Sequence, residues 1–348
     1  MRFDMKRILF AIFAIAAMVL SSCSNKVDLY ADEGEYTIVY AMLDAAADTN
    51  FFKITKSFLG NATELAQNYD ANNYKYDEIE VTFSGVFNGS TAVQTVSLDT
   101  ISKWIPYDAN STFYSGCYQT YYYTTKKLQE GKEYTINILR KADNVNVSAK
   151  ATTINNFGIT KPFSTQKVKF KGVKKGTVEW QVPDPSTMFQ TTAAYFDVTG
   201  YFHYTELMPG SNDTVHRSIT WPLGSGEAEK LFNSNDNKYL INYTPEALYD
   251  VLGSDEYLIN NSPNGVQRWF EKFEYKVSAI GDDLYNYHII NNSSSAIQDT
   301  PNYSNVENGI GLVSARISKS IRVTIEDTSR KKVLEDFPTY GFIYDPNR

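Results

Sequence analysis

The sequence predicts an all-β protein built from two immunoglobulin- or fibronectin-like β-sandwich domains in tandem, the second with one or two short helices. Segments of alternating apolar and polar residues recur along the chain, and β-branched and aromatic residues dominate them. Turns rich in glycine and asparagine separate these segments. With 348 residues, the chain is long enough for two domains.

The first sandwich is expected over residues 36–154. Residues 79–83 alternate between apolar and polar side chains, and an Asn-Gly pair, a strong signal for a hairpin turn, follows at 88–89. Short strands with turns between them over about 120 residues are typical of an immunoglobulin-like sandwich. The other strands expected here are residues 36–43, 51–58, 91–98, 118–126, 134–140 and 145–153.

Residues 155–162 are expected to be a linker, because asparagines, a glycine and a proline interrupt the pattern there. The second domain is expected over residues 163–348. Its strand around Trp180, followed by a strand that contains Tyr195, is similar to a pair of strands in fibronectin-type modules.

Two short helices are expected in the second domain. Thr244 can cap the start of one, Pro245 suits its first turn, and Glu246 complements the helix dipole. This helix would end at about residue 252, before a glycine, and the other would span residues 226–232. Residues 282–291 are a further helix candidate.

Residues 1–22 have the features of a secretory signal peptide. Basic residues precede the uncharged apolar run 8–20, which is shorter than a comfortable membrane span. The sequence Leu-Ser-Ser-Cys at 20–23 resembles the lipobox of bacterial lipoproteins. The resemblance implies cleavage before Cys23, lipid on its sulfur and an acylated amino terminus. The alternative is an uncleaved N-terminal anchor helix.

Residues 23–35 are expected to be a polar tether between the lipid and the body. Acidic residues in this segment resemble the export signal of surface lipoproteins in Bacteroidota. We therefore expect a protein anchored by lipid in the outer membrane of a Gram-negative bacterium. The periplasmic and the cell-surface face both stay open.

The charge of the chain excludes some partners. The formal net charge is −7 and we expect no cluster of Lys and Arg, so we expect no nucleic-acid partner, because phosphate binding needs concentrated positive charge. Broad docking on anionic lipid is disfavoured for the same reason. Cys117 is the only cysteine besides Cys23, so lipidation of Cys23 leaves no intramolecular disulfide.

No catalytic set, metal site or cofactor is expected. The three histidines, His203, His216 and His288, stand in no catalytic motif, and the chain has no nucleophile elbow, zinc-protease helix or Walker loop. Residues 233–237 lack the glycine and glutamate that would complete a calcium loop. A glycosidase that uses only two carboxylates stays open, because its acids need no sequence motif.

Clustered aromatic residues are the candidate ligand-facing groups. Flat rings stack on sugars and on peptides, and they lose little side-chain entropy on binding. The alternative is that alternate tyrosines fill the sandwich core. The candidates are Trp104, Tyr107, Tyr121, Tyr122 and Tyr123.

Two threonines are candidate sites of O-glycosylation. Thr100 and Thr214 each lie between an aspartate and an aliphatic residue. This pattern matches the Asp-Ser/Thr-aliphatic sequence that Bacteroidota use for protein O-glycosylation.

Four stretches, at residues 36–43, 52–59, 219–224 and 303–312, carry a family resemblance. They resemble an uncharacterised family of Bacteroidota outer-membrane lipoproteins, a domain of unknown function often encoded beside TonB-dependent receptors. The resemblance implies an outer-membrane location and a role near a nutrient-uptake complex, with a TonB-dependent receptor as partner. It implies no catalytic residues.

The function that we expect is a non-enzymatic binding or accessory module for a glycan, a peptide or another envelope protein. The alternatives are a carboxylate-based glycan hydrolase and a structural or adhesive surface subunit.

Overall fold

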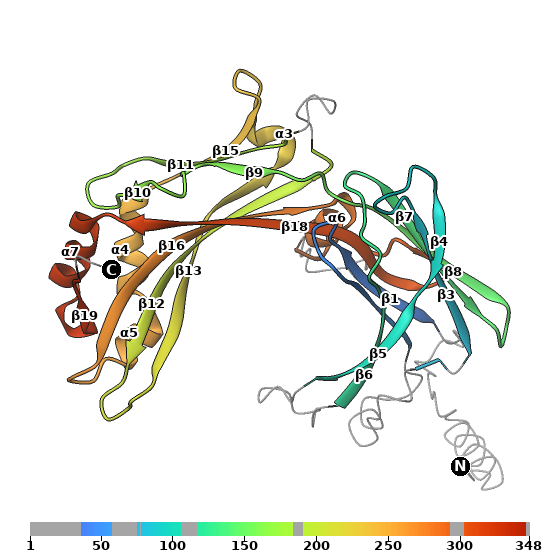
Figure 1. Ribbon diagram of the computed structural model, residues 1–348, viewed down its shortest axis with the longest axis horizontal. Helices are drawn as coiled ribbons and strands as arrows, with labels where there is room; N and C mark the ends of the chain where they lie inside the picture. Colours follow the sequence, from blue (N-terminus) through green and yellow to red (C-terminus); the bar gives the residue numbers. More distant parts are fainter. Residues whose placement is uncertain are drawn as a thin grey trace, which may run out of the picture. The chain divides into compact units, whose positions relative to one another are not determined.

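Strands make up most of the regular structure, which confirms the predicted all-β class (Figure 1). The computed structural model describes residues 36–57, 75–76, 78–105, 117–183, 191–292 and 303–345. Within these residues the strands form one ten-stranded sheet, called here the large sheet, and two smaller sheets of five and four strands.

The large sheet takes strands from both halves of the chain. Its strands are β1 (Thr37–Leu43), β2 (Asn50–Lys56), β5 (Asp99–Ile105), β6 (Cys117–Thr124), β10 (Lys167–Val168), β12 (Tyr195–Leu207), β13 (Thr214–Glu227), β16 (Gln267–Ile280), β18 (Ile310–Ile325) and β19 (Phe342–Ile343). Their order is β13-β12-β16-β18-β1-β2-β6-β5, and β10 and β19 pair with β18 and β16.

The five-strand sheet has the order β17-β8-β7-β3-β4. It comprises β3 (Ile79–Gly85), β4 (Gln94–Ser97), β7 (Glu133–Arg140), β8 (Val145–Thr152) and β17 (Val306–Glu307). The four-strand sheet has the order β14-β15-β11-β9. It comprises β9 (Gly158–Lys161), β11 (Gly176–Gln181), β14 (Phe232–Asn233) and β15 (Lys238–Tyr243).

Short helices occupy the predicted positions in the second half of the described chain. The helix expected after Thr244 forms as η3 and α4, and helices also form within 226–232 and 282–292. No helix among the described residues is long and apolar enough to cross a membrane. The helices are α3 (Ala228–Leu231), η3 (Pro245–Ala247), α4 (Leu248–Gly253), α5 (Glu256–Asn260), α6 (Asp282–Asn292), α7 (Asp327–Asp336) and η4 (Pro338–Tyr340).

The core lies between the large sheet and the smaller sheets. Phe52 of β2 packs edge-on against Phe83 of β3, with 4.9 Å between ring centroids. Phe196 of β12 packs against Trp180 of β11 with the rings tilted, at 5.0 Å between ring centroids. All four rings are buried. Each of these aromatic residues carries a large apolar area, so burying them on one side favours stacking the sheets face to face.

Both smaller sheets cover the same face of the large sheet. Val39 pairs with Gly311, Ile317 with Ala279, and Ala279 with Phe196. Paired residues share a face, and residues an even number apart on one strand also share it. The opposite face of the large sheet therefore carries the polar residues of the long strands.

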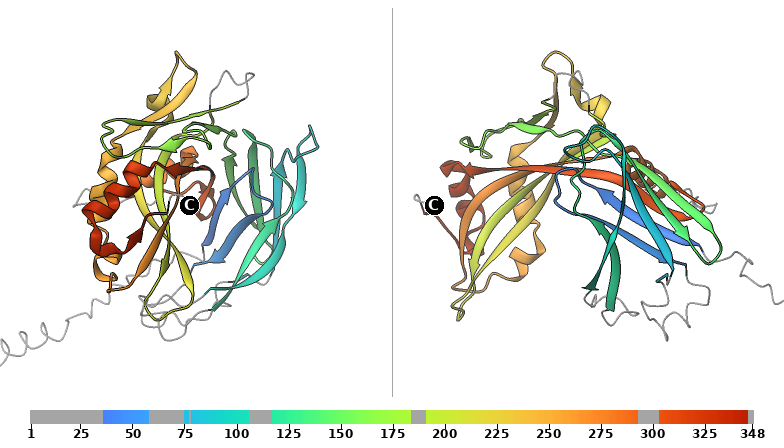
Figure 2. Two further views of the ribbon diagram at one scale, coloured as in Figure 1. Left: turned by 60° about the vertical axis from the view of Figure 1, so that its left-hand side comes forward. Right: turned by 45° about the vertical axis from the view of Figure 1, so that its right-hand side comes forward.

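Strand β18 pairs with strands from both halves of the chain, so that the two halves share one sheet (Figures 1 and 2). Residues 310–315 pair in parallel with β1, and residues 316–323 pair antiparallel with β16. Residues Tyr36–Arg348 form one compact unit. The tandem immunoglobulin-like arrangement is accordingly not confirmed.

The segment expected as a linker also carries regular structure. Within 155–162, Gly158–Lys161 forms β9, which pairs with β11. Phe157 is buried beside it, in contact with Phe196 at 5.6 Å between ring centroids. The polar residues and glycine of this segment resemble a linker, but the burial of Phe157 ties it to the core.

Gly311 permits the close approach of β18 to β1. Its φ is +132°, and a Cβ at this position would lie 2.0 Å from the backbone oxygen of Val39. Only glycine tolerates both conditions. Gly311 therefore has a specific structural role in the pairing of β18 with β1.

We expect Gly311→Ala to lower the free energy of unfolding by at least about 2 kcal/mol, because it adds backbone strain and a clash with β1. Urea denaturation measures this change. Gly158→Ala is the matched control, since a Cβ at Gly158 meets no atom within 4 Å. Equal effects of the two substitutions would contradict the role assigned to Gly311.

A buried ion pair fixes one end of the long strands. Glu206 and Arg268 are fully buried, and Arg268 donates to Glu206 Oε2 from Nη2 at 2.6 Å and from Nε at 2.8 Å. Arg217 and Tyr257 each donate to Glu206 Oε1 at 2.7 Å. Arg268 also donates to the carbonyl of Tyr340 at 2.5 Å. Burial disfavours the charged carboxylate, but these bonds outweigh it and lower the pKa of Glu206.

Glu206→Gln leaves Arg268 buried without a charge partner, so we expect a loss of about 3–5 kcal/mol of stability near pH 7. The pKa of Glu206 is lower in the folded state than in the unfolded state, where it is about 4.3, so ionisation of Glu206 stabilises the fold above that pH. This stabilisation is lost as the pH falls through the folded-state pKa. The difference between wild type and variant should therefore shrink below about pH 4. Chemical denaturation over pH 3–7 tests this, with exposed Glu229→Gln as control; a pH-independent difference would refute it.

Candidate functional site

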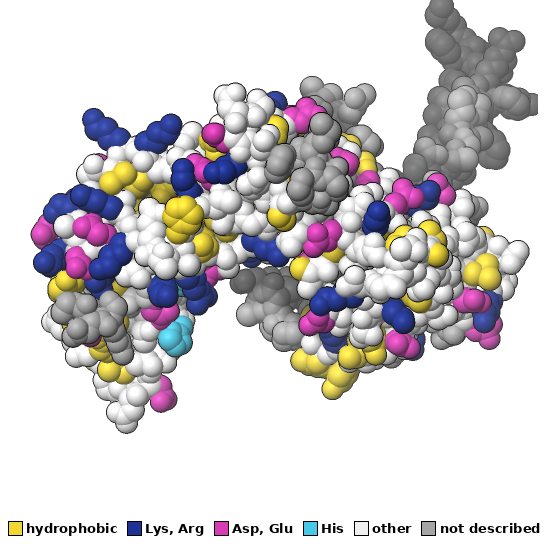
Figure 3. All heavy atoms as spheres, turned by 45° about the horizontal axis from the view of Figure 1, so that its top comes forward, with side chains coloured by type: hydrophobic (Ala, Val, Ile, Leu, Met, Phe, Trp, Pro, Cys, Tyr) yellow, Lys and Arg dark blue, Asp and Glu magenta, His cyan; other side chains and the backbone are white. Residues whose placement is uncertain are grey.

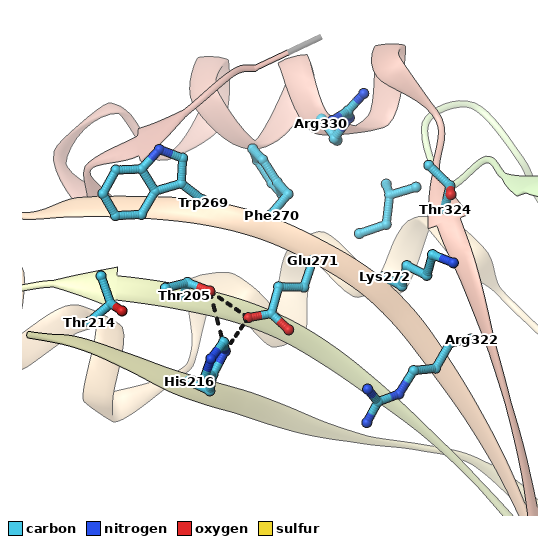
Figure 4. A pocket seen from close by; sticks show the side chains of 11 residues that line it. Thr205, Thr214, His216, Trp269, Phe270, Glu271, Lys272, Arg322, Thr324 and Arg330 are labelled. Atoms are coloured by element: carbon cyan, nitrogen blue, oxygen red, sulfur yellow. Dashed lines mark hydrogen bonds and ion pairs between the residues drawn. The ribbon is translucent and has the colours of Figure 1, made fainter. Parts of the chain in front are cut away.

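The large sheet forks where β16 and β18 separate. They pair from Ile280 to Phe273, after which β16 pairs with β19 and β18 pairs with β10. A cavity of about 590 Å³, called here the fork pocket, lies at this point (Figure 4). Six residues that line it are Thr205, His216, Trp269, Glu271, Lys272 and Arg322.

Strand register places three of these residues in one row. Thr205 of β12 pairs with His216 of β13 on one side and with Trp269 of β16 on the other. Directly paired side chains lie on the same face within contact range. This row lies on the face of the large sheet opposite the smaller sheets, because the neighbouring Tyr204 and Glu206 are buried on the inner face.

A β-bulge adds Glu271 to the row. The register of β16 shifts opposite His203, so that the buried residues Phe270 and Phe273 are three positions apart instead of two. Glu271 and Lys272 lie between them, and neither is buried. Bulges commonly redirect a side chain in this way.

The side chains of Thr205 and His216 both point to one carboxylate oxygen of Glu271 (Figure 4). Thr205 donates to Glu271 Oε1 at 2.5 Å, and His216 Nδ1 lies 2.6 Å from the same oxygen. Thr205 Oγ1 and His216 Nδ1 are 3.3 Å apart. Burial disfavours the charged form of Glu271, but the bonds from Thr205 and His216 outweigh it and lower its pKa.

A second carboxylate, that of Glu274, lies on the same face, three residues further along β16. Glu274 accepts from Arg322 Nε at 2.7 Å, and its Oε2 lies 3.1 Å from His203 Nε2. The ring of Tyr201 stacks on His203, with 6.0 Å between centroids. Burial opposes ionisation of Glu274, and the bonds from its partners again lower the pKa.

The groups around Glu271 and Glu274 differ from two known catalytic arrangements. In a nucleophilic relay, one histidine nitrogen contacts the carboxylate and the other contacts the hydroxyl. Here Thr205 and Glu271 both approach Nδ1 of His216. A glycosidase acid needs a raised pKa, whereas the pKa values of Glu271 and Glu274 are lowered.

Metal binding finds no support in the part of the chain that the structure describes. No group of three or more His, Cys, Asp or Glu residues there could hold an ion.

The aromatic residues predicted as ligand-facing lie away from the fork pocket, on β5 and β6. Trp104 pairs directly with Tyr118, and the two are 55% and 67% exposed. Their rings contact each other edge-on at 5.2 Å between centroids. Tyr122 is buried, as the core alternative expects, while Tyr121 and Tyr123 are half-buried.

The two candidate O-glycosylation threonines are both exposed. Thr100 lies on the edge strand β5, whereas Thr214 begins β13 and lines the fork pocket. A glycan on Thr214 would therefore stand at the pocket itself. Tyr107 and Cys23 lie outside the described residues.

The fork pocket could not be predicted from the sequence. Its residues come from β12, β13, β16, β18 and α7, and sequence spacing alone does not bring them together. One local feature does mark it: two consecutive charged residues, Glu271 and Lys272, separate Phe270 from Phe273 and break the alternation. That break indicates a bulge.

No protein-family model matches this chain, and no curated protein sequence matches it.

Proposed function

We propose that this protein is a lipid-anchored envelope lipoprotein with a non-enzymatic binding body, and that the fork pocket is its ligand site. One observation carries the proposal. The pocket carboxylate of Glu271 is held ionised by Thr205 and His216, whereas Lys272 has no ion-pair partner among the described residues. The pocket thus offers fixed acceptors and one available cation.

The lining of the pocket suits a ligand rich in hydroxyl groups, such as a sugar. Trp269 supplies an aromatic ring, and a flat ring stacks on the apolar face of a sugar. Thr205, His216 and Glu271 supply donors and acceptors at fixed positions. Because they stand on paired strands, little conformational freedom is lost when a ligand binds.

An accessory role beside a TonB-dependent receptor is the second candidate. The family resemblance supports it, and the exposed pair Trp104 and Tyr118 on β5 and β6 adds an apolar surface suited to protein contact. A carboxylate-based hydrolase is less favoured, because Glu271 and Glu274 both have lowered pKa values.

We expect Trp269→Ala to weaken glycan binding about tenfold, since loss of ring stacking is worth on the order of 1–1.5 kcal/mol. Affinity electrophoresis against a panel of neutral and acidic polysaccharides measures it. Tyr40→Ala is the matched control, because this exposed aromatic residue lies on β1, which contributes no residue to the pocket lining. Unchanged mobility of the wild type in every polysaccharide would reject the proposal.

The anchor is tested separately. We expect the wild type to incorporate radiolabelled palmitate and to sediment with membranes, because two or more acyl chains give stable attachment. Cys23→Ala should lose the label and retain Met1, whereas Cys117→Ala should behave as the wild type. Label retained in Cys23→Ala, or a purified wild type that begins at Met1, would overturn the envelope assignment.

A further inference from the structure

Residues 167–175 carry five lysines and no acidic residue. This segment, called here the lysine run, contradicts the expectation that the acidic body has no cluster of Lys and Arg. The net charge of −7 hides it, because the acidic residues are spread over the rest of the chain. Four of its lysines are exposed, namely Lys167, Lys169, Lys174 and Lys175.

The lysine run is held firmly against the core. Val168 and Phe170 are buried, and Lys167 and Lys169 alternate with them on the exposed side. The backbone N–H of Phe170 donates to Ser329 Oγ at 2.8 Å, and that of Glu326 donates to the Val168 carbonyl at 2.8 Å. A fixed backbone keeps the ammonium groups on one surface without a loss of backbone entropy on binding.

The lysine run begins at the edge of the fork pocket. Lys167 is the register partner of Thr324, which lines the pocket beside Arg322. Lys272 lies inside the pocket lining (Figure 4). Lys and Arg side chains gather at this end of the molecule, where β10 and α7 lie (Figure 3). The lysine run therefore adjoins the pocket, and both carry basic side chains.

Several of these charges are uncompensated. Lys171 pairs with Glu335 at 3.3 Å, and Arg322 pairs with Glu274. Lys169, Lys174, Lys175 and Lys272 have no ion-pair partner in the described part of the chain. Lysines without ion-pair partners repel one another, and a bound anion relieves this repulsion. An anionic ligand therefore binds with a more favourable electrostatic energy here than on the rest of the acidic surface.

The surface lies far from the point where the tether enters the body. Ile310 pairs with Ile38 near the start of β1, and Thr324, fourteen residues further along β18, pairs with Lys167. At about 3.3 Å per residue, this separation along the strand is about 46 Å. A membrane held by the proposed anchor is therefore a poorly placed partner for the lysine run.

We propose that the fork pocket and the lysine run together bind an acidic oligosaccharide; this inference rests on the proposed function. A sugar ring in the pocket meets Trp269 and the hydroxyl-binding groups of Thr205 and Glu271. The carboxylate of Glu271 repels an acidic group at that point. The carboxylate or sulfate groups of the neighbouring sugar units lie along the lysine run instead.

Affinity electrophoresis with polygalacturonate as the acidic probe and dextran as the neutral one tests the inference on the full-length protein. We expect the triple variant Lys169→Gln, Lys174→Gln, Lys175→Gln to bind polygalacturonate roughly tenfold more weakly at physiological salt. Each exposed lysine attracts the polyanion independently, and salt screens each attraction without abolishing it. The matched control is Lys126→Gln, Lys132→Gln, Lys141→Gln, which removes three exposed lysines of the first half. It should bind as the wild type does.

The outcomes separate the two proposals. If dextran and polygalacturonate bind equally and Trp269→Ala weakens both, the pocket binds glycans and only the acidic preference is refuted. If neither polysaccharide binds, both proposals fail. If poly-L-glutamate binds as well as polygalacturonate and Trp269→Ala has no effect, the surface is a general anion site and the inference is overturned. An unchanged triple variant with intact thermal unfolding also overturns it.

Discussion

The two-sided pairing of β18 is the constraint on which the rest of the structure depends. Its first residues complete the layer that covers the five-strand sheet, and its later residues complete the layer that covers the four-strand sheet. A single strand thus supplies hydrogen bonds to both halves, and its inner side chains contribute to both parts of the core. Gly311 is needed where the two halves meet, since any side chain there would strike β1.

The fork pocket follows from the same constraint. Because β18 leaves β16 to pair with β10, and β16 pairs with β19 instead, a space opens at the point where the two strands diverge. The bulge at Glu271 lies at the edge of this space and directs charged groups toward it. At the inner face of the same region, the ion pair of Glu206 and Arg268 ties β12 and β16 to the last residues of the described chain. Buried hydrogen bonds therefore hold the inner face of the sheet opposite the polar pocket.

Local features of the structure could be predicted from the sequence. The alternating strand at residues 79–83, its Asn-Gly turn and the helix that starts after Thr244 all depend on short-range patterns, and all three form. The pairing of β1 with β18 could not be predicted in this way, because it joins residues about 270 positions apart. The pairing of Gly158–Lys161 with β11 was equally hidden, because the Gly and Asn residues of 155–162 outweigh one buried Phe157 in a purely local pattern.

The candidate site depends on long-range information even more strongly. Thr205, His216 and Glu271 meet only because register and a bulge align three strands. The lysine run, in contrast, is visible in the sequence, and whole-chain charge is too coarse a measure to find it. Its relation to the pocket becomes apparent only through the pairing of Lys167 with Thr324.

The parallel contact between β1 and β18 also bears on when the protein can fold. Synthesis from the amino terminus delivers β1 long before β18. Until then the sheet edge at β1 has no partner, and an open edge invites pairing with other chains. High contact order slows such closure further. Native structure in the first half must consequently wait until β18 has been synthesised, and a holding chaperone would have a defined edge to protect until then.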